Sequence, residues 1–206
     1  SQAVSYSCVE VDKNMMDDLP FSLYKNCKCI VCNTYGRMGY RSAVRIGDFL
    51  LKEGSTEIIK IPVRMSPNVK VREIYYKDEK LMGIKFYRHG DYRLIDNAKM
   101  PVEAVKDGSI FEGEIYFFDM AEEQLQLLCY SLGLNKRFQL KLGGNKAGFF
   151  GSCEVIPKSG LFSNGNAFNP EEYARAFDVN CRDGKINRNK RKLEEILSFQ
   201  NRVTKL

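Results

Sequence analysis

The stretch SIFEGEIYFFDMAEEQLQLLCYSLGL constrains the fold of this chain more than any other part of the sequence. Its first part, residues 109–120, is rich in aromatic and β-branched side chains and predicts a strand. Leu125, Leu128, Cys129 and Leu132 then recur at the spacing of one buried helix face. A strand that leads directly into a helix with one apolar face predicts a sheet packed against helices.

The ends of this helix are also signalled in the sequence. Asp119, followed by Glu122 three positions later, predicts an N-cap with a capping-box arrangement. Gly133 follows the apolar stripe and predicts the C-terminus of the helix.

Other elements follow from local patterns of apolar residues, turn residues and helix caps. We expect strands or extended segments at 42–51 and 56–66, a hairpin at 69–90, a strand–loop–strand unit at 138–157, and helices at 169–177 and 187–199. Strands outnumber helices, so the sequence predicts an α+β protein.

Composition narrows the environment and the chemistry. No apolar run approaches the roughly 20 residues that a membrane-spanning helix needs, and the N-terminal segment lacks the pattern of a signal peptide. Seven cysteines at irregular spacing do not resemble a secreted disulfide framework, so we expect reduced thiols and a cytoplasmic protein without membrane contact. The only histidine is His89, which leaves little scope for histidine-rich metal sites.

Positive charge is concentrated at the C-terminal end. The net charge is +6, and the segment from Arg182 onward has eight Lys or Arg residues against three acidic residues, a net +5. Such a basic tail favours a polyanionic partner such as nucleic acid. A solvated helix face explains the same charges equally well.

A glycine-rich loop, LGGNKAGFFG, lies between two predicted strands at 142–151. Glycines allow a backbone to approach a ligand closely, and exposed amides beside a lysine suit phosphate oxygens. The pattern is neither a Walker A loop nor a Rossmann fingerprint, because a strand follows the loop. On spacing alone, a tight β-turn without a ligand is the stronger alternative.

The neighbourhood of this loop resembles the C-terminal half of the RAMP superfamily, the RNA-binding proteins of CRISPR effector complexes, particularly type III. The match comprises a strand ending in an acidic residue, the helix EEQLQLLCYSLGL, and a strand leading to the lysine-bearing loop GGNKAGFFG. MGIKFYRHG (82–90) and CIVCNTYG (29–36) are similar to further segments of type III subunits. The resemblance covers roughly residues 27–160. The N-terminal ferredoxin-like half of the family cannot be placed on this sequence, so no catalytic aspartate is assigned.

The resemblance implies a ferredoxin-like (RRM-like) antiparallel sheet with packed helices and a zinc-knuckle-like insertion at 27–36. Residues 1–160 would form a partial RAMP-like domain, and residues 161–206 a basic helical C-terminal extension. The implied function is an RNA-binding subunit of a CRISPR type III ribonucleoprotein in antiviral defence. Its implied partners are a guide (crRNA-like) RNA and other effector subunits.

Two segments are candidates for contact with that RNA. In the glycine loop, Lys141, Gly143, Gly144 and Lys146 would meet the sugar–phosphate chain. A second basic and aromatic strip, Lys85, Tyr87, Arg88 and His89, could stack on bases without reading their identity. The alternative for this strip is an amphipathic strand with its aromatic residues inward.

The cysteines of the segment NCKCIVC suggest a structural metal. Cys27, Cys29 and Cys32 could place three thiolates around one tetrahedral zinc, with Cys8 as the leading fourth ligand and His89 as the second choice. Type III backbone subunits often have a zinc site beside this segment, so the resemblance also favours a metal. Free thiols or a redox pair are the alternatives.

Two other functions remain open at this point. One is an endoribonuclease, since some relatives cut RNA with a histidine or a metal-assisted aspartate. The other is a zinc-stapled protein-interaction module that docks on neighbouring subunits without touching RNA.

Overall fold

The computed structural model describes residues 30–37, 39–62, 76–77, 80–81, 86–94, 98–180 and 184–205. Within these ranges the protein is a mixed α+β structure, as the sequence predicts. The helices are α4 (Ile30–Tyr35), α6 (Glu122–Ser131), α7 (Pro170–Asn180) and α8 (Gly184–Leu197), with short 3₁₀ turns η3 (Tyr92–Leu94), η4 (Lys146–Gly148) and η5 (Phe199–Asn201). All described strand pairs are antiparallel.

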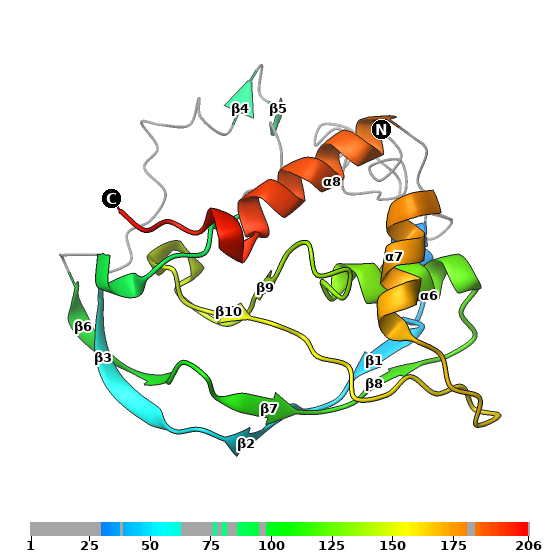
Figure 1. Ribbon diagram of the computed structural model, residues 1–206, viewed down its shortest axis with the longest axis horizontal. Helices are drawn as coiled ribbons and strands as arrows, with labels where there is room; N and C mark the ends of the chain where they lie inside the picture. The colour runs from blue at the N-terminus through cyan, green and yellow to red at the C-terminus, as the bar shows by residue number, and fades with distance from the viewer. Residues whose placement is uncertain are drawn as a thin grey trace.

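A long two-stranded ribbon forms one side of the molecule and curves along the lower edge of Figure 1. One side of the ribbon comprises β1 (Val44–Ile46), β2 (Leu50–Glu53) and β3 (Thr56–Pro62), which pair with β8 (Ile115–Phe117), β7 (Ile110–Glu112) and β6 (Ala98–Val105), respectively. Backbone hydrogen bonds bridge the interruptions: Gly47 N–H donates to Glu114 O (2.9 Å), and Lys106 N–H donates to Ser55 O (3.0 Å). The three pairs therefore behave as one continuous ribbon.

Strand β6 is not predicted by the sequence, because Pro101 lies within it and proline lacks a backbone donor. In the structure Pro101 pairs with Lys60 of β3. The described β6 has one strand partner, so it is an edge strand, where proline is tolerated.

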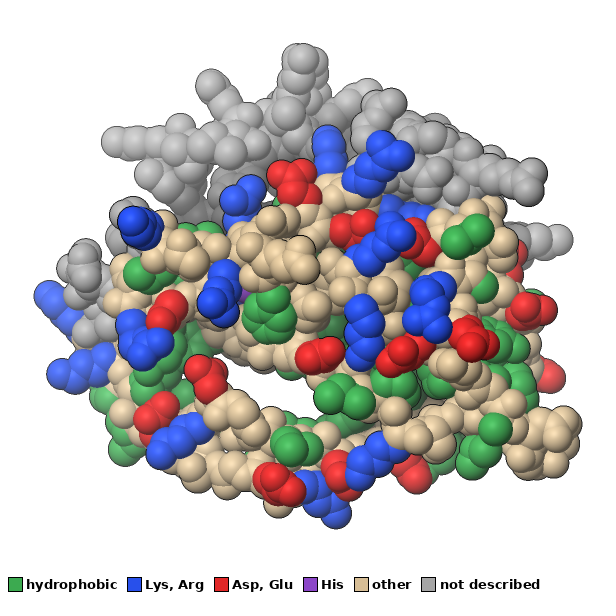
Figure 2. All heavy atoms as spheres, viewed as in Figure 1, with side chains coloured by type: hydrophobic (Ala, Val, Ile, Leu, Met, Phe, Trp, Pro, Cys, Tyr) green, Lys and Arg blue, Asp and Glu red, His purple; other side chains and the backbone are tan. Residues whose placement is uncertain are grey.

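The middle of the ribbon is poorly covered. All four residues of β2 are exposed, and the exposed fractions of Ile46, Leu50 and Ile58 are 68%, 63% and 79%. Figure 2 shows an opening between the ribbon and the rest of the molecule on the face it displays. Apolar side chains on the ribbon are thus left without a packing partner in the described part of the chain.

The remaining strand pairs are short. β4 (Tyr76–Lys77) pairs with β5 (Lys80–Leu81), which agrees with the predicted 69–90 hairpin at these four residues, whereas residues 86–89 are not in a strand. β9 (Leu140–Lys141) pairs with β10 (Ser152–Cys153), the strand–loop–strand unit predicted around the glycines. Among the described residues every sheet is two-stranded, and a ferredoxin-type sheet is not among them.

The main core gathers around α6, whose predicted stripe is confirmed. Leu125, Leu128 and Cys129 are buried together with Val44 of β1 and Ala174 of α7. Burial raises the pKa of the Cys129 thiol to about 12, so this thiol is a core group and not a nucleophile at neutral pH.

The start of α6 differs from the prediction, whereas its end agrees. The N-cap is Ala121, whose N–H donates to Oε1 of Gln124 (2.9 Å). Asp119 lies two residues earlier in a left-handed conformation (φ 48°), because the chain turns out of β8 before the helix begins. Gly133 follows the C-cap residue with φ 74°, as expected of a glycine at that place.

The described part of the segment expected to be a C-terminal extension, 161–180 and 184–205, is packed into the body of the molecule. α7 lies across α6 (Figure 1), and Phe162, Phe168 and Tyr173 pack against the main core. A second buried cluster joins Tyr130 of α6 and Phe138 to Leu197 of α8. No described helix is long and apolar enough to span a membrane.

Candidate nucleic-acid interface

The glycine loop between β9 and β10 has an unusual backbone. Gly143, Asn145, Phe149 and Gly151 all have positive φ, between 51° and 78°. A Cβ atom on Gly151 would lie 1.8 Å from the carbonyl oxygen of Leu142, so only glycine fits this position. The loop is therefore a shaped structure that depends on its glycine content.

The tip of this loop is open. Gly143 and Gly144 are exposed, and a Cβ on Gly143 would meet no atom within 4 Å. The N–H groups of Gly143 and Gly144 donate no hydrogen bond to another described residue. Such unpaired amides beside cationic side chains can bind an anion.

The two lysines of the loop are partly engaged by the backbone. Lys141 Nζ donates to the carbonyls of Arg88 (2.9 Å) and Lys146 (3.2 Å), and Lys146 Nζ donates to Gly143 O (2.7 Å). Burial, followed by the nearby charge of Lys146, lowers the pKa of Lys141 to about 8. Lys146 thus reinforces the tip of the loop, while Lys141 ties the loop to the segment that contains Arg88.

The second predicted strip lies directly beside this loop. Besides the Lys141–Arg88 contact, Gly90 packs on Phe149, whose ring would lie 2.7 Å from a Cβ atom at position 90. Arg88 is exposed and forms no ion pair with a described residue, and Tyr87 is half-buried. Lys85 lies outside the described residues.

His89 has a different place from the one expected. Its side chain is 1% exposed, with Nδ1 2.8 Å from Ser152 Oγ and Nε2 3.0 Å from Leu197 O. Its ring also lies 4.4 Å from that of Phe199, centroid to centroid. In Figure 2 almost none of the histidine surface is visible. An enclosed imidazole has no face with which to stack on a base, so His89 belongs to the core.

The same enclosure bears on two other expectations for His89. Both ring nitrogens lie within hydrogen-bonding distance of protein oxygens, so neither is free to bind zinc. The endoribonuclease alternative with a catalytic histidine would need this imidazole, because the sequence has no other.

Of the four predicted zinc ligands, only Cys32 lies among the described residues. It is buried (4% exposed) in α4 and follows Cys29 by three positions in the sequence. Cys8, Cys27 and Cys29 lie outside the described ranges. Within those ranges no three Cys, His, Asp or Glu side chains are grouped to hold a metal.

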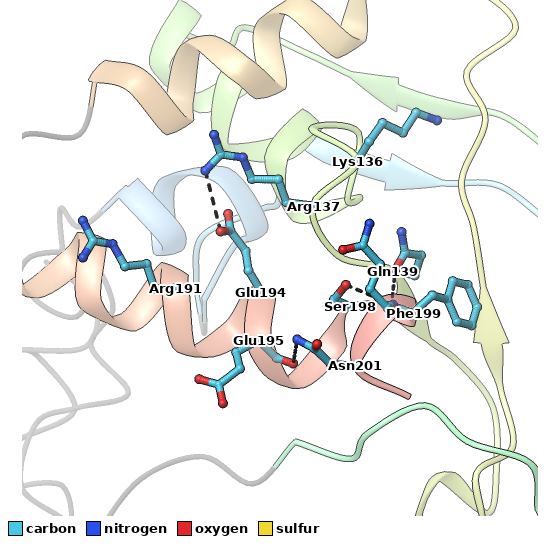
Figure 3. A pocket seen from close by; sticks show the side chains of 10 residues that line it. Lys136, Arg137, Gln139, Arg191, Glu194, Glu195, Ser198, Phe199 and Asn201 are labelled. Carbon is cyan, nitrogen blue, oxygen red and sulfur yellow. Dashed lines mark hydrogen bonds and ion pairs between the residues drawn. The ribbon is translucent and has the colours of Figure 1, made fainter. Parts of the chain in front are cut away.

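A polar pocket of about 450 Å³ is lined by Phe199 together with side chains of the 136–139 segment and of α8 (Figure 3). Two of its three cations are paired: Arg137 with Asp178 (3.1 Å) and Glu194 (3.7 Å), and Lys136 with Glu154 (3.4 Å). The third, Arg191, forms no ion pair with a described residue. The pocket therefore offers an anion less free positive charge than the surface around the glycine loop does.

Comparison with known proteins adds no family assignment. No protein-family model matches the chain, and a search of curated proteins finds no match.

The sequence singled out the loop and the basic strip but not their contact. Nothing in the residue pattern signals that Gly90 must be small because Phe149 lies on it. Nor does the pattern reveal that the C-terminal residues return to His89, a contact between positions 108 residues apart.

Proposed function

We propose that this chain is the RNA-binding subunit of a CRISPR type III ribonucleoprotein that its sequence resembles, acting in the cytoplasm. The observation that carries the proposal is the junction between the glycine loop and the basic strip. Two segments selected separately from the sequence lie side by side, joined by Lys141 and Arg88 (2.9 Å). In this proposal the chain binds a guide RNA without regard to base sequence.

The phosphate contacts come from the tip of the loop. The N–H groups of Gly143 and Gly144 donate no hydrogen bond to another described residue, and Lys146 adds a positive charge beside them. Arg88 extends the positive surface from the neighbouring segment. Backbone amides and flexible cations recognise the phosphate chain and not the bases, which suits a subunit that must accept any guide.

Stacking contacts come from the basic strip, with Phe86 in place of His89. Phe86 is 45% exposed and Tyr87 is half-buried, so aromatic surface remains accessible after His89 is assigned to the core. Base–aromatic stacking tolerates any base because every base has a π-face.

Binding of single-stranded RNA tests the proposal. We would measure the affinity of a fluorescent RNA of arbitrary sequence between 50 and 300 mM salt for the wild type and the variant Arg88→Gln/Lys146→Gln. Phosphate contacts predict that the variant loses roughly tenfold or more in affinity and has a shallower salt dependence. The matched control is Lys52→Gln/Lys106→Gln, which removes two exposed cations from the ribbon. Absence of RNA binding by the wild type, or equal losses in both variants, would refute the proposal.

The exposed ribbon favours a second role, docking on other subunits of the effector. Ile58 on β3 is 79% exposed, and each described strand of the ribbon has one partner strand, which leaves an edge to which another chain can add. Ile58→Lys should leave the isolated chain folded but reduce its recovery in the assembled complex. Normal assembly of this variant would remove the ribbon from the interface.

The ferredoxin-like fold of the resemblance and the zinc are part of the same proposal. Cys32 is buried at the first turn of α4, directly after the segment that contains Cys27 and Cys29. Thiolates at these positions would hold a structural zinc and stabilise the fold around α4.

A further inference from the structure

The basic tail has two parts with different surroundings. Lys190 in α8 is buried (7% exposed), with Nζ 2.6 Å from Asp178 Oδ1 and 2.7 Å from Asp178 O. This cation holds α8 to α7 and is not available to an external polyanion. Arg191 and Lys192 are exposed on α8, whereas Arg202 and Lys205 lie beyond the helix.

The residues after α8 form a segment that returns to the centre of the molecule, which we name the C-terminal strap (Phe199–Lys205). The N–H of Val203 donates to His89 O (2.8 Å), and Val203 pairs in parallel with Gly90. Phe199 packs its ring on His89 at 4.4 Å. The strap is therefore held in place by backbone pairing and by one buried imidazole.

This position places the strap next to the candidate RNA site. Gly90 contacts Phe149 of the glycine loop, and it also pairs with Val203 of the strap. The segment 88–90 thus lies in contact with both the loop and the strap. Lys146, Arg88 and Arg202 come from three separate parts of the sequence, and these parts meet around His89.

Arg202 interacts electrostatically with Asp91 but forms no ion pair with it. The Asp91 carboxylate is instead bound by Arg93, with Nε 2.8 Å and 2.9 Å from the two oxygens. Arg202 and Lys205 are exposed and form no ion pair with a described residue. Cations left unpaired beside a loop with open amides favour a ligand with phosphates along its length.

We propose that the C-terminal strap is part of the RNA-binding surface, with Arg202 and Lys205 contacting phosphates next to those bound by the glycine loop. This inference rests on the proposed function and adds to it. The basic tail binds RNA through specific contacts of the strap and not through its overall positive charge. His89 contacts Leu197 and Phe199, from which the strap departs.

The test compares two pairs of substitutions in the same tail. Arg202→Gln/Lys205→Gln removes two cations from the strap, and Arg191→Gln/Lys192→Gln removes two exposed cations from α8. RNA binding is measured against salt for both variants, the wild type and the loop variant Arg88→Gln/Lys146→Gln. Two lost phosphate contacts should reduce the salt slope by about 1.4 and the affinity by roughly 10- to 30-fold for the strap variant alone.

A second measurement does not depend on affinity. Photo-cross-linking of the RNA to the wild-type protein, followed by peptide mass spectrometry, should place adducts within 199–205. Thermal melting should show that both tail variants are as stable as the wild type, because substitutions at exposed positions have little effect on stability.

The outcomes separate the two proposals. Binding that falls in the loop variant but not in the strap variant, without cross-links in 199–205, overturns the strap and leaves the loop. Equal losses for the strap and α8 variants also overturn the strap, because they indicate diffuse charge. No RNA binding by the wild type overturns both.

Discussion

The Nε2 atom of His89 lies 3.0 Å from the carbonyl oxygen of Leu197, so the only imidazole of the chain joins two segments 108 residues apart. Because a carbonyl only accepts, Nε2 must carry the hydrogen, and Nδ1 then accepts from the hydroxyl of Ser152 (2.8 Å). One neutral side chain thus connects the end of α8 to β10.

The protonation of His89 gives a first prediction. Burial lowers the pKa of His89 below 6.5, and the positive charge of Lys141 lowers it further. Since the sequence contains one histidine, a single imidazole resonance should appear in the NMR spectrum and titrate below that of a free histidine. A midpoint at or above 6.5 would contradict the enclosed neutral imidazole.

The same shift has a consequence for stability against pH. The unfolded chain binds a proton at His89 below about pH 6.5, whereas the folded chain resists it, so the free energy of unfolding should fall as pH decreases below 6.5. Below the folded pKa both states are protonated and this contribution levels off. Urea unfolding between pH 7.5 and 5 would measure the change.

The buried ion pair between Lys190 and Asp178 gives a second prediction. Lys190→Met removes the closer of the two cations paired with the Asp178 carboxylate, whose side chain is only 9% exposed, and leaves Arg137 at 3.1 Å. Loss of this charged hydrogen bond should destabilise the fold by about 2 kcal/mol. Lys192→Met, on the exposed side of α8, is the matched control and should change stability by less than about 0.5 kcal/mol. Similar urea midpoints for the two variants would show that the pair contributes little.

The two outer glycines of the loop give a third prediction, because they share φ 78° but differ in their surroundings. Gly151→Ala would place Cβ 1.8 Å from Leu142 O and should distort the β9–β10 unit, whereas Gly143→Ala meets no atom within 4 Å. We expect a marked loss of thermal stability for Gly151→Ala and a cost of about 1 kcal/mol for Gly143→Ala. Equal melting temperatures for the two variants would contradict the close approach of Leu142 O to Gly151.

The pKa of Lys141 gives a fourth prediction, which concerns the proposed RNA site. Since burial lowers this pKa to about 8, the ammonium of the free protein loses its charge between pH 7 and 9. RNA affinity should weaken over this range, and Lys141→Arg should abolish the pH dependence because arginine stays charged. The comparison is valid if the variant melts like the wild type. A flat profile for the wild type would exclude Lys141 as a contributing charge.

The proposed zinc gives a fifth prediction. Purified protein should contain one zinc per chain, and a strong chelator should lower its melting temperature. Cys27→Ser should lose the metal, while Cys153→Ser, a change at a half-buried thiol in β10, should keep it. Absence of zinc together with melting that does not respond to chelator would remove the site.

Sequence patterns predicted the parts of the fold that depend on neighbours along the chain. The stripe of Leu125, Leu128 and Cys129 became the core face of α6, and Gly133 ended that helix, because helix periodicity and caps are local properties. The prediction of Asp119 as N-cap was wrong by two residues, since the chain turns first at Asp119. β6 was missed because Pro101 argues against a strand unless the strand is an edge.

By itself the sequence determined where the helices, the turns and the glycine loop lie, and that cations gather at the C-terminal end. Only the tertiary structure decided which of those cations are buried: Lys190 pairs with Asp178 inside the fold, while Arg202, which precedes the residue that pairs with Gly90, is exposed and forms no ion pair with a described residue. It also decided that His89 is a core residue and not a surface one. The physical reason is that periodicity and turn chemistry act over a few residues, whereas burial and pairing depend on contacts between distant residues, such as His89 and Leu197, 108 positions apart.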